Sequence, residues 1–287
     1  MSAGAPTTLS IVIPALNESE NMPALMAGLP LGELGALGWD VEVIVVDNAS
    51  EDGTGDLARA LGATVVEQPR RGYGNAYAAG FDAARGDIIA TGDADLTYPF
   101  DHLPDLLREL VDGGVDFLTT DRLHRANAAA MKTSHAIGNA VLSTVSRALF
   151  GSAFRDSQSG MWIFRRSVWS SLDVRSPGMA FSQEIKNEAW RRGFTCREVP
   201  IEYRPRGGVV KLNATRDGLT NLAQLFAHRL RRPVDLASTS QDVVSTAIPA
   251  PASPLASQGP SIGGGAPRRV IDLREPQDAT LASDGVS

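Results

Sequence analysis

Short apolar runs separated by polar segments dominate the first half of the chain. The runs predicted to be strands are residues 9–13, 41–46, 63–66, 88–91 and 115–119. The first intervening helix is predicted to begin near residue 22, and others cover residues 55–61 and 103–111. Residues 70–75 are followed by a predicted helix of small residues that runs through residue 84. Nearly continuous apolar strands are typical of a sheet that is buried on both faces. This alternation predicts an α/β fold with a mostly parallel, doubly wound sheet and helices on both faces.

The second half is less regular. It predicts helices at residues 137–150, 181–192 and 216–231, and strands at residues 161–164 and 199–203. From about residue 236 no aromatic residue occurs, and Ala, Ser, Pro and Gly dominate. Such a segment buries too little apolar surface to offset the entropy lost on ordering. We therefore expect one folded domain, residues 1–235, which is large enough to be an enzyme, followed by a disordered tail, residues 236–287.

Composition narrows the class of protein. The 287 residues are 43% hydrophobic, which allows a substantial core, and the net charge of −6 gives no support for a nucleic-acid partner. A single cysteine, Cys196, rules out an internal disulfide and fits a reducing cytoplasm. Neither a signal peptide nor a run of about 18 apolar residues is found. We expect a cytoplasmic protein whose membrane contact would be peripheral, on the inner face of the cell membrane.

Acidic residues follow the predicted strand at 88–91. Asp93 and Asp95 lie one residue apart, and two carboxylates at this spacing make a hard oxygen site that suits Mg²⁺ or Mn²⁺ and a diphosphate. The alternative is that both only form Asx turns or cap the next helix. Residues 14–18 and 47–52 also follow predicted strands. Because ligands bind beyond the carboxyl ends of parallel strands, we expect all three segments to share one crevice.

Two common nucleotide-binding motifs are missing. A dinucleotide-binding domain has a G-x-G-x-x-G turn directly after its first strand, whereas this chain has residues 14–18 there, without glycine. Gly72 and Gly74 follow a different strand, and Tyr77 stands in the place of the third glycine. A Walker motif is absent as well. A hydride-transfer or ATPase function therefore has little support.

Several segments, taken in order, resemble a known family. The stretches IVIPALNE (11–18), VVDNASEDGT (45–54) and GDAD (92–95) look like the three successive signatures of family 2 glycosyltransferases. Five later segments resemble the branch that includes dolichyl-phosphate mannose and dolichyl-phosphate glucose synthases. They are residues 156–160, 164–166, 198–201, 203–206 and 211–212. The resemblance covers residues 9–232.

This resemblance implies a GT-A fold and a metal-dependent, inverting transfer of a hexose. The donor would be a UDP- or GDP-linked nucleotide-sugar, and the acceptor a dolichyl or undecaprenyl phosphate. The site residues carried over are Pro14, Asn17 and Glu18 for the nucleotide pocket, Asp47 for the base or ribose, Asp93 and Asp95 for the metal and the sugar-diphosphate, Gln158 to complete the metal site, and Arg122 for phosphate. Thr120 and Asp121 stand where this branch has Gly-Ser before the arginine.

The chemistry of the transfer can be argued separately. Negative charge develops on the departing diphosphate, so the site needs positive charge placed there beforehand. A phosphate monoester, whose second pKa is about 6, is already a nucleophile near pH 7 and needs no base. Arg204, Arg206 and Lys211 are candidates to bind such an acceptor. The alternative is a solvated basic loop.

Other functions remain open from the sequence. A soluble hydroxyl acceptor, in polysaccharide or secondary-metabolite assembly, would need a base, for which Glu184 is the candidate. Glu184 could equally be a structural ion-pair partner on its helix. A non-catalytic nucleotide-sugar binding module is a further alternative. A nucleotidyltransferase would need a glycine-rich, basic loop after the first strand, which this chain lacks. The leucine stripe of the last predicted helix suits either a membrane interface or packing on the domain.

Overall fold

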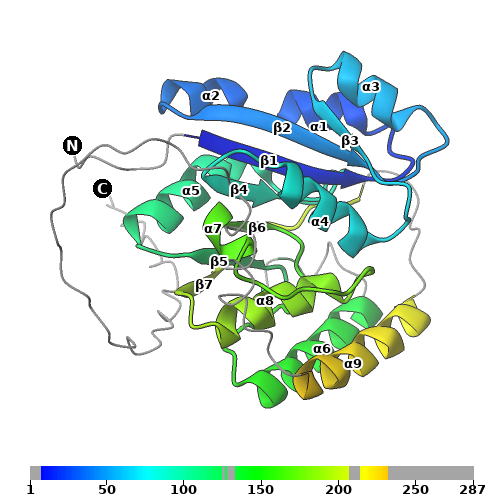
Figure 1. Ribbon diagram of the computed structural model, residues 1–287, viewed down its shortest axis with the longest axis vertical. Helices are drawn as coiled ribbons and strands as arrows, with labels where there is room; N and C mark the ends of the chain where they lie inside the picture. The colour runs from blue at the N-terminus through cyan, green and yellow to red at the C-terminus, as the bar shows by residue number, and fades with distance from the viewer. Residues whose placement is uncertain (1–7, 125–126, 128–132, 207–213, 232–287) are drawn as a thin grey trace, which may run out of the picture.

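The computed structural model describes residues 8–124, 127, 133–206 and 214–231 (Figure 1). Its centre is a seven-stranded sheet in the order β3-β2-β1-β4-β6-β5-β7. The strands are β1 (Thr8–Ala15), β2 (Asp40–Asp47), β3 (Thr64–Glu67), β4 (Ile88–Thr91), β5 (Phe117–Asp121), β6 (Trp162–Arg165) and β7 (Cys196–Pro200). β6 runs antiparallel to its neighbours β4 and β5, and every other pair is parallel. The predicted mostly parallel sheet is confirmed.

Helices follow most of the strands. They are α1 (Met22–Gly28), α2 (Leu31–Ala36), α3 (Thr54–Ala60), α4 (Tyr73–Ala83), α5 (Leu103–Asp112), α6 (Thr133–Phe150), α7 (Arg166–Trp169), α8 (Phe181–Arg191) and α9 (Ala214–Leu230), with a 3₁₀ turn, η1 (Phe100–His102), before α5. The short helices α2 and α7 were not predicted. Each has only one buried side chain, so it leaves a weak apolar period in the sequence.

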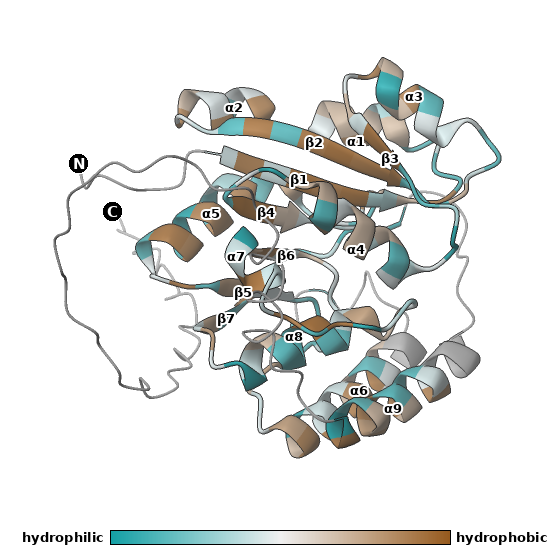
Figure 2. Ribbon diagram, viewed as in Figure 1, coloured by the Kyte–Doolittle hydropathy of each residue, from teal (hydrophilic) through white to brown (hydrophobic). Residues whose placement is uncertain are grey.

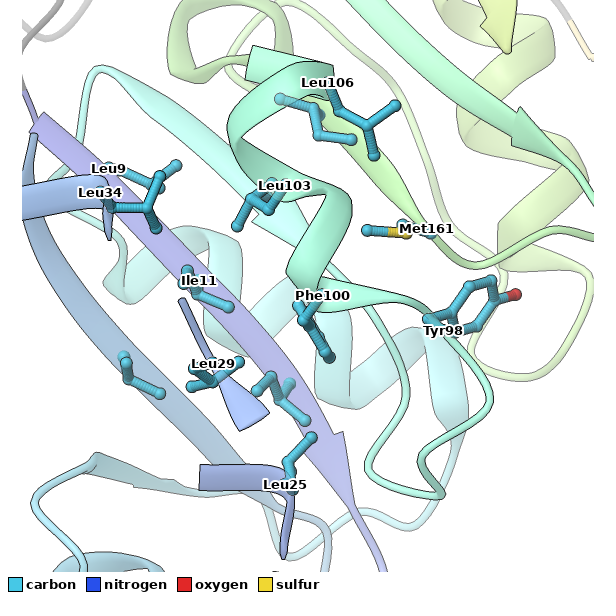
Figure 3. Close-up of a cluster of buried hydrophobic side chains, with 14 of the residues drawn as sticks. Leu9, Ile11, Leu25, Leu29, Leu34, Tyr98, Phe100, Leu103, Leu106 and Met161 are labelled. Carbon is cyan, nitrogen blue, oxygen red and sulfur yellow. The ribbon is translucent and has the colours of Figure 1, made fainter. Parts of the chain in front are cut away.

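Helices cover both faces of the sheet because successive side chains of a strand point to opposite sides. On one face, Leu9, Ile11 and Ile13 of β1 pack with side chains of α1, α2 and α5. Figure 3 shows part of this cluster, with Tyr98 at its edge and the tyrosine hydroxyl pointing away from the leucines. On the other face, Val12 packs with side chains of α4, α7 and α8. Brown, hydrophobic segments run along β1 and β2 in the ribbon (Figure 2).

Helices α6 and α9 lie side by side outside α8 (Figure 1). Leu142, Phe150 and Leu225 form a small core of their own between them. The outer surface of this helix pair exposes large apolar side chains. They are Ile137 and Val141 of α6, and Leu219, Phe226 and Leu230 of α9. None of the helices in the described ranges is long and apolar enough to cross a membrane.

The strand predicted at residues 199–203 is wrong in its bounds. β7 begins at Cys196, which pairs with Phe117, and ends at Pro200, which pairs with Asp121. Beyond it the chain leaves the sheet, because the Arg204 N–H donates to the Thr97 carbonyl oxygen (3.0 Å). This turn brings the segment after β7 to the end of β4. The tail predicted from residue 236 lies outside the described residues.

Gly80 tests the packing of α4 on the sheet. A Cβ atom at this position would lie 2.3 Å from Val12 Cγ1 and 2.8 Å from Val46 Cγ2. Because these atoms belong to two central strands, Gly80→Ala should lower the free energy of unfolding by about 2 kcal/mol, measured by urea denaturation. Gly35→Ala is the control, since nothing lies within 4 Å of its Cβ position. An equal stability of the two variants would contradict the close approach of α4.

Candidate active site

Three loops meet at the carboxyl ends of the neighbouring strands β1, β2 and β4. Each loop holds one residue with a left-handed backbone: Asn17 (φ 52°), Ala49 (φ 63°) and Leu96 (φ 67°). Within the described residues, these are the non-glycine positions with positive φ. Such conformations cost of order 1 kcal/mol each and persist where surrounding contacts enforce them. The strained non-glycine residues of the described structure therefore lie beyond the carboxyl ends of three neighbouring strands.

Hydrogen bonds lock the first two loops together. The Asn17 N–H donates to Ser50 Oγ (3.0 Å), and Asn17 Oδ1 accepts the N–H of Glu51 (2.8 Å). The Glu18 N–H donates to Thr54 Oγ1 (2.9 Å). Pro14, next to the end of β1, pairs with the end of β2 in the sheet. The structure thus brings together the residues predicted for a nucleotide pocket.

Asp47 ends β2 and is buried. Its Oδ1 accepts the Ser50 N–H (2.9 Å). A Cβ atom at Gly55 would lie 2.5 Å from its Oδ2, so a larger residue at this position would displace the carboxylate. The next residue, Asn48, holds the loop after β3. Its amide donates to the carbonyl oxygens of Gln68 (2.9 Å) and Arg70 (2.8 Å). Asp47 is therefore fixed at the carboxyl end of β2 by its own loop.

Asp93 is supported from below by two tyrosines of α4. Tyr73 and Tyr77, one turn apart, both reach Asp93 Oδ1, at 3.1 and 3.2 Å. Gly160 permits this approach, since a Cβ there would lie 2.1 Å from the Tyr73 hydroxyl oxygen. Burial and the neighbouring charge of Asp95 raise the pKa of Asp93 to about 7. A cation bound at this pair would remove the cause of the repulsion.

Asp95 is buried, and both of its oxygens are occupied. Oδ1 accepts the N–H (3.2 Å) and the hydroxyl (2.6 Å) of Thr97. Oδ2 pairs with Arg206 Nη2 at 2.6 Å. Arg206 comes from the segment after β7, more than a hundred residues away in sequence. Of Arg204 and Arg206, the two predicted acceptor-phosphate residues within the described ranges, Arg206 is the one that the structure brings to the acidic pair.

Arg122 follows β5 and is buried in a bidentate ion pair. Its Nε and Nη2 lie 2.8 and 3.1 Å from the two carboxylate oxygens of Asp156. Its guanidinium carbon stands 6.0 Å from the ring centre of Tyr98 and 5.3 Å from that of Tyr203. Burial opposes the charge of Arg122, but Asp156 keeps its pKa well above the ordinary value. Its positive charge partly opposes the rise in the pKa of Asp93, so Arg122 acts on the acidic pair through space.

Asp156 is itself anchored. Its carbonyl oxygen accepts a hydrogen bond from the buried Lys186 Nζ (2.6 Å). Its N–H donates to Glu198 Oε1 (3.0 Å), and the Arg155 N–H donates to Oε2 (2.7 Å). Burial lowers the pKa of Lys186 and raises that of Glu198. These buried charges hold the loop before β6 against β7 and α8.

Gln158 does not face the acidic pair through a free amide. Its Nε2 donates to Ser157 Oγ (3.0 Å) and to Gln183 Oε1 (2.9 Å). Its Oε1 accepts from Asn221 Nδ2 of α9 (3.1 Å). The oxygen that a metal would need is therefore engaged with α9.

Glu184 and Arg204 are also held by structural partners. Glu184 Oε2 accepts the Ser176 N–H (2.7 Å), and its Oε1 pairs with Arg231 (2.7 Å). Arg204 binds both oxygens of Asp101, each at 2.9 Å. Lys211 lies outside the described residues.

A divalent metal fits the donor set at the end of β4. Mg²⁺ is commonly bound through one or two carboxylates plus substrate phosphates, rather than by a cage of protein ligands. Asp93 and Asp95 supply two carboxylates, and a guanidinium already stands against one of them as a positive charge. Across the described part of the chain, no group of three His, Cys, Asp or Glu is arranged to hold a metal. The arrangement thus suits a metal that arrives with a diphosphate.

Sequence reasoning missed the supports of this site. Tyr73 and Tyr77 are four residues apart in a helix, a spacing that places them on one face. This spacing could have paired them as one functional unit. Tyr98, whose hydroxyl accepts the Gly160 N–H (2.6 Å), carries no comparable signal. Asp156 lies in the segment 156–160 that resembles the family branch, but its ion pair with Arg122 is not visible in the sequence. Their roles depend on contacts between distant segments.

Relatives with known names match most of the chain. A low-salt glycan biosynthesis hexosyltransferase, Agl6, of Haloferax volcanii is 37% identical over 74% of this chain and 51% of its own length. The chain thus spans about half of that relative. A dolichyl-phosphate hexose transferase of the same organism is 31% identical over 73% of this chain and 89% of its own. A polyprenol monophosphomannose synthase of Mycolicibacterium smegmatis is 30% identical over 75% of this chain and 85% of its own length.

Solved structures share the fold. Glucosyl-3-phosphoglycerate synthase of Mycobacterium tuberculosis, in complex with Mn²⁺, UDP-glucose and phosphoglyceric acid, has a TM-score of 0.63 at 24% identity. The match covers 79% of this chain and 81% of that one. The same enzyme with Mg²⁺ and UDP has a TM-score of 0.58 at 23% identity, over 80% and 81% of the two chains. The predicted GT-A fold is confirmed.

A family model completes the comparison. The model described as glycosyl transferase family 2 matches residues 10–172. This range contains the three loops at the ends of β1, β2 and β4, together with Arg122 and Asp156. The chain therefore belongs to glycosyl transferase family 2 and is a glycosyltransferase.

Proposed function

We propose that this enzyme transfers a hexose, with inversion, from a UDP- or GDP-linked sugar to a polyprenyl phosphate. The observation that carries the proposal is the ion pair between Asp95 and Arg206, which joins an acidic pair suited to a metal-diphosphate to a basic segment suited to an acceptor phosphate. The names of two relatives, a dolichyl-phosphate hexose transferase and a polyprenol monophosphomannose synthase, support this acceptor.

The donor would lie across the ends of β1, β2 and β4. Pro14, Asn17 and Glu18 would line the nucleotide pocket, and Asp47 would contact the base or ribose. The complexes of glucosyl-3-phosphoglycerate synthase with UDP-glucose and Mn²⁺ and with UDP and Mg²⁺ support a nucleotide and a metal as ligands of this enzyme. The interlocked, strained loops are consistent with a pocket that is formed before the ligand binds.

Asp93 and Asp95 would hold Mg²⁺ or Mn²⁺, which would supply positive charge at the departing diphosphate. Tyr73 and Tyr77 orient the Asp93 carboxylate by hydrogen bonds. Thr97 orients Asp95. We do not retain Gln158 as a metal ligand, because its amide is engaged with α8 and α9.

Arg122 would contribute a second positive charge to the site. Asp156 fixes its Nε and one terminal nitrogen, while the faces of Tyr98 and Tyr203 flank its guanidinium. A cation held this firmly loses little further side-chain entropy on meeting a phosphate. We assign Arg122 to electrostatic stabilisation of the phosphates.

The acceptor phosphate would be bound by Arg206 and Lys211. Arg204, which both oxygens of Asp101 hold, is better assigned as the anchor of this segment. A phosphate acceptor needs no base at neutral pH, since its second pKa is about 6. This agrees with Glu184, whose two oxygens are taken by Ser176 and Arg231.

The exposed apolar face of α6 and α9 supports a lipid acceptor. Phe226 and Leu230 are 49% and 83% exposed, and Arg147 and Arg229 lie at the surface of the same two helices. An apolar helix face with basic residues beside it suits the interface of an anionic membrane. We propose that this face rests on the inner surface of the cell membrane.

Transfer itself is the first test. Radiolabelled UDP- and GDP-hexoses with undecaprenyl or dolichyl phosphate should yield an organic-extractable, mild-acid-labile product. Asp95→Asn should lower its rate of formation at least about 100-fold, because positive charge at the leaving group is lost. Asp105→Asn, on the exposed side of α5, should stay within twofold of the wild type. Absence of labelled lipid with every donor would overturn the acceptor assignment.

A soluble acceptor is the second candidate. It is favoured by the phosphoglyceric acid in the complexes of glucosyl-3-phosphoglycerate synthase. A hydroxyl acceptor would require a carboxylate base, and Glu184 is the sequence candidate for it. The two acceptors therefore make opposite demands on Glu184.

Glu184→Gln separates these demands. With a phosphate acceptor, turnover should stay within about threefold, while the free energy of unfolding falls by about 1–3 kcal/mol because Arg231 loses a buried ionic partner. Initial rates and urea denaturation measure the two effects. A loss of turnover of about 100-fold or more, with the fold intact, would favour the hydroxyl acceptor.

Vesicle sedimentation tests the membrane surface. The double variant Phe226→Ser/Leu230→Ser should bind vesicles of phosphatidylglycerol and phosphatidylethanolamine about tenfold or more weakly, since each apolar side chain contributes roughly 1.5–3 kcal/mol when fully buried. Leu37→Ser is the control, because this residue is 53% exposed at the end of α2. Equal loss in both variants would argue against a specific face.

A further inference from the structure

We propose that Arg206 is an exchangeable counter-cation. In the enzyme without donor it occupies the coordination position of the metal on Asp95, and the metal-nucleotide complex displaces it toward the acceptor phosphate. The inference rests on the proposed function and adds to it a positive coupling between donor and acceptor, together with the residue that carries this coupling.

The first step is the competition for one oxygen. Thr97 saturates Asp95 Oδ1 with two hydrogen bonds, which leaves Oδ2 as the open oxygen of a nearly buried carboxylate. Arg206 Nη2 takes Oδ2 at 2.6 Å, and the arginine side chain is only 28% exposed. A metal bound through Oδ2 and the guanidinium cannot hold the same position. Metal and Arg206 are therefore alternative partners of Asp95.

Arg206 can leave Asp95 without unfolding the segment that carries it. Tyr203 and Arg204 are tied to the body of the enzyme, through Asn127 Oδ1 (2.9 Å) and the Thr97 carbonyl oxygen (3.0 Å). Arg204 is also fixed by Asp101. Arg206 lies two residues beyond these anchors, so it can leave Asp95 while Arg204 stays in place. The exchange needs a rearrangement of only a few residues.

The charges of the two cations favour the metal over Arg206. A divalent cation shared by Asp93 and Asp95 is attracted more strongly than one guanidinium to one carboxylate. Once the metal neutralises Asp95, Arg206 loses its anionic partner and is available to a phosphate dianion. By linkage, whatever binds Arg206 favours metal binding to the same degree. Donor and acceptor therefore bind with positive coupling.

Metal affinity tests the exchange without turnover. Free Mn²⁺ is measured by electron paramagnetic resonance, with saturating UDP or GDP and no acceptor, for the wild type and for variants. Arg206→Ala should bind Mn²⁺ about tenfold more tightly, because the competing cation is gone. Arg206→Lys should lie between Arg206→Ala and the wild type. Arg108→Ala, on the exposed side of α5 and paired with Asp105, should stay within twofold of the wild type.

Opposite results would overturn the exchange. Unchanged or weaker Mn²⁺ binding by Arg206→Ala contradicts competition, and wild-type Mn²⁺ affinity in Asp95→Asn contradicts the position of the metal. Neither measurement uses a sugar or a lipid, so a missing lipid product in the transfer assay leaves both readings intact. The acceptor half is measured apart: Arg206→Ala should raise the KM for polyprenyl phosphate about tenfold without raising the KM for the donor. An unchanged acceptor KM would overturn this half.

Discussion

Two carboxylates, Asp93 and Asp95, lie one residue apart at the end of a buried strand. Their burial, together with their mutual repulsion, is the constraint on which the site depends. Three hydrogen-bond donors and one cation contact them. The donors are the hydroxyls of Tyr73, Tyr77 and Thr97, and the cation is the Arg206 guanidinium. A low-dielectric environment makes an unpaired charge costly, so the pair has a high affinity for any cation that fits. The same property that destabilises the isolated enzyme thus prepares it for a metal-diphosphate.

The second half of the domain maintains this environment through a buried ionic network. Arg122, Asp156, Lys186 and Glu198 lie on four segments that are distant in sequence, and they satisfy one another with short, charge-assisted contacts. Breaking such a network by removing one member costs several kcal/mol, because the remaining charge is left buried. The network keeps Arg122 between two aromatic rings and near the acidic pair. Asp156, Lys186 and Glu198 therefore contribute to function by positioning Arg122.

Much of the fold was predictable because its information is local. The strand at residues 88–91 and the helices near residues 103–111 and 181–192 agree with the structure to within a residue or so, since their apolar period is strong. The end of β7 was misplaced because Tyr203 and Arg204 continue an extended-looking sequence, yet hydrogen-bond outside the sheet. The strand-end loops could be grouped from topology alone, because parallel strands end at one edge.

The sequence by itself determined the family, the α/β alternation and the acidic pair, because ordered motifs and apolar periodicity are properties of neighbouring residues. Only the tertiary structure decided the partners. It assigned Gln158 to contacts with α8 and α9 and Glu184 to Ser176 and Arg231, and it selected Arg206 rather than Arg204 for Asp95. Which basic residue reaches which acid depends on where a segment leaves the sheet, and that is set by hydrogen bonds between residues distant in sequence.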